Sequence, residues 1–65
     1  LGDDRIKMLF YLTLSDTYFD SKNYQESLEY LNKARQKAQF LGLTKELDNI
    51  SRKESTIRLE ASIYA

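Results

Sequence analysis

The sequence contains no cysteine, no histidine and no proline, and it has only two glycines. Without cysteine the chain can form no disulfide, and without cysteine and histidine it lacks the ligands of the usual structural zinc sites. The same absences remove the side chains that most often act as strong nucleophile or general base in enzymes. We therefore expect a non-catalytic protein with no metal and no cofactor.

The chain is short for a folded domain. It has 65 residues, and a chain of that size buries only about 60 % of its unfolded surface. With no disulfide or metal available, stability must come from helix packing, from a second copy, or from a larger protein. The chain begins Leu1-Gly2-Asp3 without a starting methionine, and we expect it to be an excerpt of a longer protein.

Charge is balanced overall but unevenly distributed. Ten basic residues stand against ten acidic ones, which argues against nucleic acid as the main partner. Residues 1–30 carry a net charge of −3 and residues 31–65 a net charge of +3. The simpler interpretation is solvated helix faces, and the sharper one is head-to-tail stacking of an acidic edge on a basic edge.

No apolar run reaches the roughly 18 residues that a membrane span needs, and no signal peptide is visible. The expected compartment is therefore the cytoplasm or the nucleus.

The two glycines divide the chain into helices. Each follows a leucine, and 40 residues separate Gly2 from Gly42. Because glycine is favoured just past a helix C-terminus, this spacing suggests a repeat of about that length. The pattern predicts an all-α fold of three antiparallel helices in a single unit, residues 1–65, with helices over about 4–21, 24–41 and 44–64.

Short polar residues mark the expected helix starts. Asp3 or Asp4 can cap the first helix, and Thr44 can cap the third. Asn23 followed by Glu26 has the spacing of a capping box for the second helix. The polar break before that helix is only about two residues long, so the first two helices should be antiparallel neighbours.

The three helices differ in how their apolar residues are arranged. The first is apolar on more than one side, so it is either the central helix or has a second face that awaits a neighbouring repeat or ligand. The second has one regular stripe with small residues that permit close approach. The third has a sparse stripe and several short polar residues, and we expect it to be the least stable helix.

The run YLTLSDTYFDSKNYQESLEYLNKA, residues 11–34, resembles a tetratricopeptide repeat of the longer, roughly 40-residue variety. The family's pattern of aromatic, small and apolar positions falls on Tyr11, Leu14, Ser15, Tyr18, Tyr24, Ser27, Leu31 and Ala34. The chain departs from that pattern where Lys22 replaces a preferred glycine and Gln39 replaces the closing proline. The resemblance implies one and a half units of a right-handed superhelical stack, in which helix pairs bury their faces against one another. The core that we expect comprises Tyr11, Leu14, Tyr18, Tyr24, Leu28, Leu31, Ala34, Ala38 and Leu41.

The resemblance also implies a candidate site. In that family the first helix of each unit lines a concave surface, and the corresponding residues here are Leu9, Leu12, Thr13, Asp16, Phe19 and Asp20. The family's clamp for a terminal carboxylate uses basic and amide side chains, which are absent from these positions. An apolar strip edged by aspartates instead suits a protein or peptide that offers apolar anchors and a few basic residues.

Other interpretations of these residues remain open. Leu9, Leu12 and Phe19 can also be explained as packing against the third helix. Asp16 and Asp20 lie one helical turn apart, but two carboxylates alone are a weak signal for a cation site.

The expected function is that of a protein–protein interaction scaffold, with self-association as a further possibility. Two alternatives remain. One is the peptide-sensing repeat region of a signalling or transcription regulator. The other is a three-helix module similar to the microtubule-interacting-and-trafficking type, which binds amphipathic helices.

Overall fold

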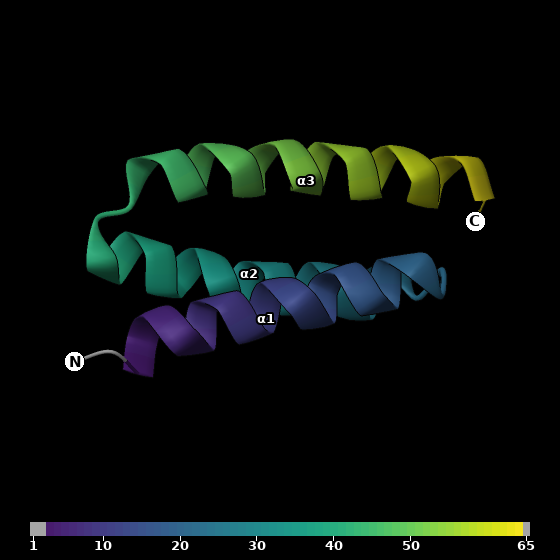
Figure 1. The fold of residues 1–65 in the computed structure, drawn as a ribbon. Helices are drawn as coiled ribbons and strands as arrows, with labels where there is room; N and C mark the ends of the chain where they lie inside the picture. The colour runs from purple at the N-terminus through teal and green to yellow at the C-terminus, as the bar shows by residue number, and fades with distance from the viewer. Residues whose placement is uncertain (1–2, 65) are drawn as a thin grey trace.

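The computed structural model describes residues 3–64, which form three α-helices joined by short turns (Figure 1). Helix α1 spans Asp3–Asp20, α2 spans Tyr24–Leu41 and α3 spans Thr44–Tyr64. Successive helices run antiparallel, so the end of α1, the start of α2 and the end of α3 lie at the same end of the molecule. The all-α prediction and the three helix ranges are confirmed to within a residue or so. The expected superhelical, tetratricopeptide-like arrangement remains a prediction.

Helices α1 and α2 end in the same backbone motif. At the end of α2, the N–H groups of Gly42 and Leu43 donate to the carbonyls of Gln39 and Ala38 at 3.2 and 3.0 Å. Gly42 has φ +69°, the left-handed conformation that this motif requires. The predicted glycine stop after α2 is therefore confirmed, whereas Gly2 lies outside the described residues.

The corresponding position after α1 is occupied by lysine. Lys22 has φ +65°, and the N–H groups of Lys22 and Asn23 donate to the carbonyls of Phe19 and Tyr18 at 3.0 and 2.8 Å. The chain thus adopts at Lys22 the backbone conformation that glycine provides at Gly42, at a conformational cost that a side chain with a Cβ must bear.

The side-chain caps predicted for α2 and α3 were wrong in detail. Asn23 precedes α2, but its side chain makes no capping hydrogen bond, so the capping box with Glu26 is not formed. Thr44 is the first residue of α3 rather than its cap, and the carbonyl of Leu43 accepts from Leu47 N at 3.0 Å. Asp3 and Asp4 lie in the first turn of α1, where carboxylates favour the positive end of the helix dipole.

Two buried serines connect α1 and α2. Ser15 and Ser27 are 1 % and 0 % exposed. Ser15 Oγ donates to Ser27 O at 2.9 Å, Ser27 Oγ donates to Ser15 O at 2.7 Å, and the two hydroxyl oxygens are 3.1 Å apart. Side chains this small let the two backbones approach closely, and their reciprocal bonds satisfy the buried hydroxyls.

Helix α2, and not α1, occupies the centre of the molecule. It packs against both other helices, whereas α1 and α3 approach each other much less closely. The interpretation of α1 as the central helix was therefore wrong. Much of its apolar excess is exposed to solvent: Ile6, Leu9 and Phe10 are 65 %, 52 % and 59 % exposed.

The core lies between the three helices and is small. Its fully buried apolar members are Met8, Leu31, Ala34, Ala38, Ile50 and Ile57. Leu31, Ala34 and Ala38 were expected there, and the remaining expected core residues are only half-buried. Tyr11, Tyr18 and Tyr30 line one side of the α1–α2 pair, with Tyr18 and Tyr30 stacked at 5.5 Å between ring centroids.

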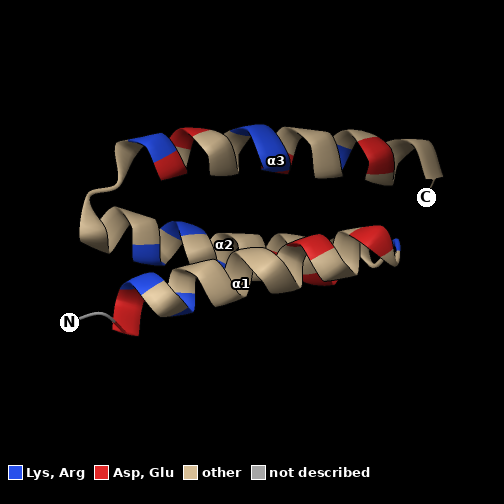
Figure 2. Ribbon diagram, viewed as in Figure 1, with Lys and Arg blue, Asp and Glu red and all other residues tan. Residues whose placement is uncertain are grey.

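Ion pairs within the chain partly neutralise the charge asymmetry of the sequence. Lys37 Nζ lies 3.1 Å from Asp4 Oδ1, and Lys53 Nζ lies 2.9 Å from Asp16 Oδ1. Both pairs join the acidic half of the sequence to the basic half. Figure 2 shows the later part of α1 with only acidic positions, opposite a helix, α3, that carries both signs.

Candidate functional site: a groove between α1 and α3

The weak contact between α1 and α3 leaves a groove between these two parallel helices. We call it the α1–α3 groove and define it by two adjacent cavities. The first cavity, of about 410 Å³, is lined by Leu12, Glu46, Asn49, Ile50, Arg52 and Lys53. The second, of about 300 Å³, is lined by Asp16, Phe19, Arg52, Lys53, Thr56 and Ile57.

Apolar side chains form the floor of each cavity. Ile50 and Ile57 are buried on α3 and belong to the core. Leu12 and Phe19, on α1, are partly buried and pack against that core. Both pairs are spaced by seven residues, which is two helical turns, so each pair lies on one face of its helix.

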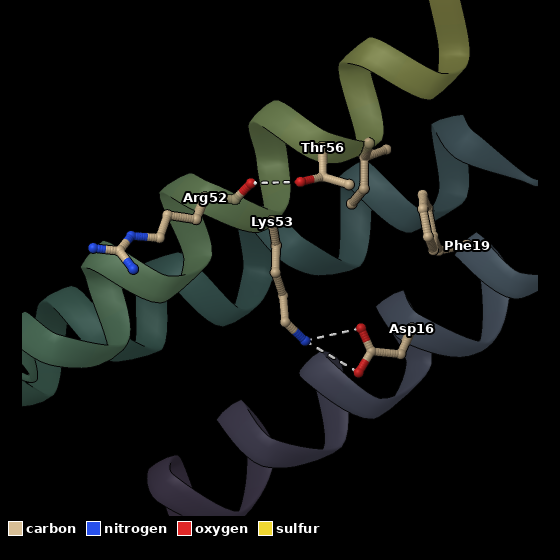
Figure 3. Close-up of a pocket in the computed structure, with 6 residues that line it drawn as sticks. Asp16, Phe19, Arg52, Lys53 and Thr56 are labelled. Carbon is tan, nitrogen blue, oxygen red and sulfur yellow. Dashed lines mark hydrogen bonds and ion pairs between the residues drawn. The ribbon is translucent and has the colours of Figure 1, made fainter. Parts of the chain in front are cut away.

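A salt bridge crosses the groove between the two cavities. Figure 3 shows Lys53 reaching from α3 toward the Asp16 carboxylate on α1. Lys53 Nζ donates to both carboxylate oxygens, at 2.9 and 3.1 Å. The pair is about half-exposed, at 42 % for the lysine side chain and 59 % for the aspartate. Its contribution to stability is therefore small, about 0–1 kcal/mol, but it divides the groove into two compartments.

The polar rim of the groove is built mainly by α3. Arg52 forms an exposed ion pair with Asp48 one turn earlier, at 3.2 Å. Thr56 Oγ1 donates to the carbonyl of Arg52 at 3.2 Å, so its methyl group is left to line the second cavity. At the far end of the groove, Lys22 Nζ lies 4.6 Å from the centre of the Tyr64 ring, which adds a contact between the α1–α2 turn and α3.

The structure brings together half of the predicted site residues. Leu12, Asp16 and Phe19 line the groove. Leu9, Thr13 and Asp20 are exposed and line neither cavity. Thr13 is used locally, since its hydroxyl donates to the Leu9 carbonyl at 3.0 Å. The interpretation that apolar residues of α1 pack against α3 holds for Leu12 and Phe19, whereas Leu9 is 52 % exposed.

The α3 wall was not anticipated from the sequence. The missed residues are Glu46, Asn49, Arg52, Lys53 and Thr56. Their spacing places them on one side of a helix, and this pattern was available in the sequence. What was not available was the knowledge that this side of α3 faces α1.

Another carboxylate, Glu54, is held by two arginines between α2 and α3, outside the groove. Glu54 accepts from Arg35 of α2 and from Arg58 of its own helix, the latter at 2.9 and 3.1 Å. The pKa of Glu54 is held below its ordinary value, chiefly by the hydrogen bonds from Arg58 and then from Arg35. These hydrogen bonds attach α3 to α2, and none of the three side chains lines the α1–α3 groove.

Within residues 3–64, no group of three or more acidic side chains is placed to hold a metal ion, and no helix is long and apolar enough to cross a membrane. Comparison with models of known protein families, with curated proteins and with solved structures gives no match to this chain.

Proposed function

We propose that the chain is a non-catalytic protein–protein interaction module that binds a segment of another protein in the α1–α3 groove. The observation that carries this proposal is the pair of apolar-floored cavities between α1 and α3. Concave sites with an apolar floor and a few polar groups at the rim are where ligands usually bind.

The chemistry of the groove favours binding over catalysis. Two carboxylates line the groove, Glu46 and Asp16, and Asp16 already accepts two hydrogen bonds from Lys53, so it is not positioned to take a proton from a ligand. No cysteine or histidine is present in the sequence to act in its place.

The arrangement also bears on the kind of partner. The sequence suggested a partner that places basic residues over Asp16 and Asp20. Since Lys53 already occupies Asp16, the basic partner residue is more simply assigned to Asp20, which is exposed and forms no ion pair within residues 3–64. The partner's main contribution is then apolar side chains for the two cavities.

The context of the module is a further part of the proposal. The tetratricopeptide resemblance makes it one segment of a helical scaffold in the cytoplasm or nucleus. The trafficking-type three-helix modules named above also bind their partners in a groove between two helices. For this reason we retain such a module as a second candidate function.

The proposal can be tested by selecting peptides that bind the chain and then blocking the groove. Thr56→Trp places a large side chain in the second cavity without changing charge. Ser55→Trp is the matched control, because Ser55 is the exposed neighbouring residue on α3 and lines neither cavity. We expect selected peptides to bind the wild-type chain and Ser55→Trp alike and to bind Thr56→Trp at least about tenfold more weakly.

Two results would contradict the proposal. If a large random peptide library yields no binder to the folded chain, the groove is not a peptide site. If binders are obtained and Thr56→Trp leaves their affinity unchanged, the interaction surface lies elsewhere.

A further inference from the structure

The two cavities have a fixed spacing that constrains what can fill them. Leu12 and Phe19 mark the cavities on α1, and Ile50 and Ile57 mark them on α3. Each pair is separated by seven residues of helix, which corresponds to a rise of about 10.5 Å. Both walls therefore give the same distance between the two apolar floors.

That distance discriminates between ligand conformations. An extended strand presents side chains to one face at every second residue, so its same-face spacings are about 7 and 13 Å. Neither value matches 10.5 Å. An α-helix presents residues i and i+7 on the same face at about 10.5 Å, because it has the same rise as the groove walls. A helical ligand lying along the groove therefore meets both cavities in register.

The Asp16–Lys53 salt bridge limits which side chains the ligand can carry between its two apolar anchors. The Asp16–Lys53 pair lies between the cavities and would face ligand positions i+3 and i+4. A large apolar side chain there would bury the pair without replacing its contact with water, which is unfavourable. A small or polar side chain at these positions leaves the pair hydrated.

Charge adds a requirement beside the second cavity. Asp20 follows Phe19 on α1, outside the lining of both cavities, is exposed, and forms no ion pair within residues 3–64. On the opposite wall, Arg52 is already paired with Asp48. A basic side chain of the ligand can therefore pair with Asp20, whereas the Lys22 ammonium at the end of the groove lies over the Tyr64 ring.

We propose that the α1–α3 groove accepts an amphipathic α-helix of another protein that carries two apolar anchors seven residues apart. Small or polar residues lie between the anchors, over the Asp16–Lys53 pair, and a basic residue beside one anchor faces Asp20. This inference rests on the function proposed above and specifies its ligand.

The test uses synthetic alanine-rich helical peptides of about 18 residues, long enough to form a helix in water. One peptide has leucines seven residues apart, with glutamine between them and a lysine beside the second leucine. The control peptide has the same composition but leucines five residues apart, which places them on opposite faces. Affinity is measured by titration of the isotope-labelled chain, following backbone amide signals by NMR.

We expect the seven-residue spacing to bind about tenfold more tightly than the five-residue spacing, because the control can bury only one leucine. Amide shifts should appear around both Ile50 and Ile57 with the first peptide. Asn49→Trp, which fills the first cavity, and Thr56→Trp, which fills the second, should each remove that advantage. Glutamate in place of the peptide lysine should weaken binding a few-fold at low salt.

Each other outcome overturns a defined part of the argument. Equal binding by both spacings, with shifts confined to the groove, overturns the spacing rule and leaves the groove as a binding site. Preferential binding of a proline-rich peptide with anchors three residues apart, a spacing of about 9 Å, would show that the ligand is not an α-helix. Shifts outside the groove with every peptide overturn both the inference and the proposed function.

Discussion

The α1–α2 pair and the α3 helix are attached to the molecule in different ways. The α1–α2 interface is close and specific, with Ser15 and Ser27 buried in reciprocal hydrogen bonds and a turn of three residues, 21–23, between the helices. Helix α3 buries Ile50 and Ile57 and packs the partly buried Leu47 against the core, but among residues 3–64 it has no such side-chain-to-backbone hydrogen bonds to another helix and is further attached by ion pairs that include Arg35–Glu54 and Lys53–Asp16.

The difference explains why the groove lies where it does. At the buried serine contact α1 and α2 are packed closely together, whereas the long side chains of Lys53 and Asp16 connect α3 to α1 and leave room between those two helices. Because such exposed or half-exposed pairs stabilise the fold only slightly, α3 should also be the first helix to detach. The following predictions test this contrast.

The largest effect is expected from Ser15→Leu, which attacks the close interface. Ser15 is 1 % exposed, so the added carbons must push α1 and α2 apart and leave the Ser27 hydroxyl with a poorer set of partners. We expect the free energy of unfolding to fall by about 1–3 kcal/mol, as measured by urea denaturation followed by circular dichroism. Thr17→Leu is the control on an exposed site of the same helix and should change stability by less than about 0.5 kcal/mol. An unchanged midpoint for Ser15→Leu would mean that α1 and α2 do not meet at this serine.

A smaller loss of stability is expected from a substitution at Gly42, in the turn between α2 and α3. Gly42 has φ +69°, and a Cβ added there meets no atom within 4 Å. Gly42→Ala should therefore be destabilising through backbone conformation alone, by about 1 kcal/mol. A chemically synthesised chain with D-alanine at position 42 is the decisive control, because D-residues favour positive φ. It should be at least as stable as the wild type. Equal destabilisation by both alanines would show that something other than φ makes this position require glycine.

The sequence predicted the helix ranges well, but it did not predict which helix packs against both of the others. Leu41-Gly42 and the polar break at Lys22-Asn23 marked the two turns, because their effects act over a few residues. The small residues of α2 correctly indicated a close contact, and Ala34 and Ala38 are fully buried.

What the sequence could not provide was the arrangement of whole helices. Its most apolar segment, α1, looked central, yet α2 with fewer large apolar residues takes that place because small side chains permit contacts on two sides. The groove combines residues 37 positions apart, such as Asp16 and Lys53, and no local pattern indicates that pairing. The three groove residues on α1 were predicted only because the family resemblance supplied a concave face.

The smallest effect, and the sharpest test of how α3 is attached, concerns pH. The hydrogen bonds from Arg58 and Arg35 hold the pKa of Glu54 below its ordinary value of 4.5. The ionised carboxylate is thus favoured in the folded state, so this stabilisation is fully present above pH 4.5 and is lost as the pH falls through the lower folded pKa. Hydrogen exchange measured across this range should show α3 amides losing protection before those of α1 and α2. In Glu54→Gln, the difference in protection between α3 and the α1–α2 pair should depend less on pH. If all three helices instead lose protection together in the wild type, α3 is as firmly attached as the α1–α2 pair, and the contrast between the two regions does not hold.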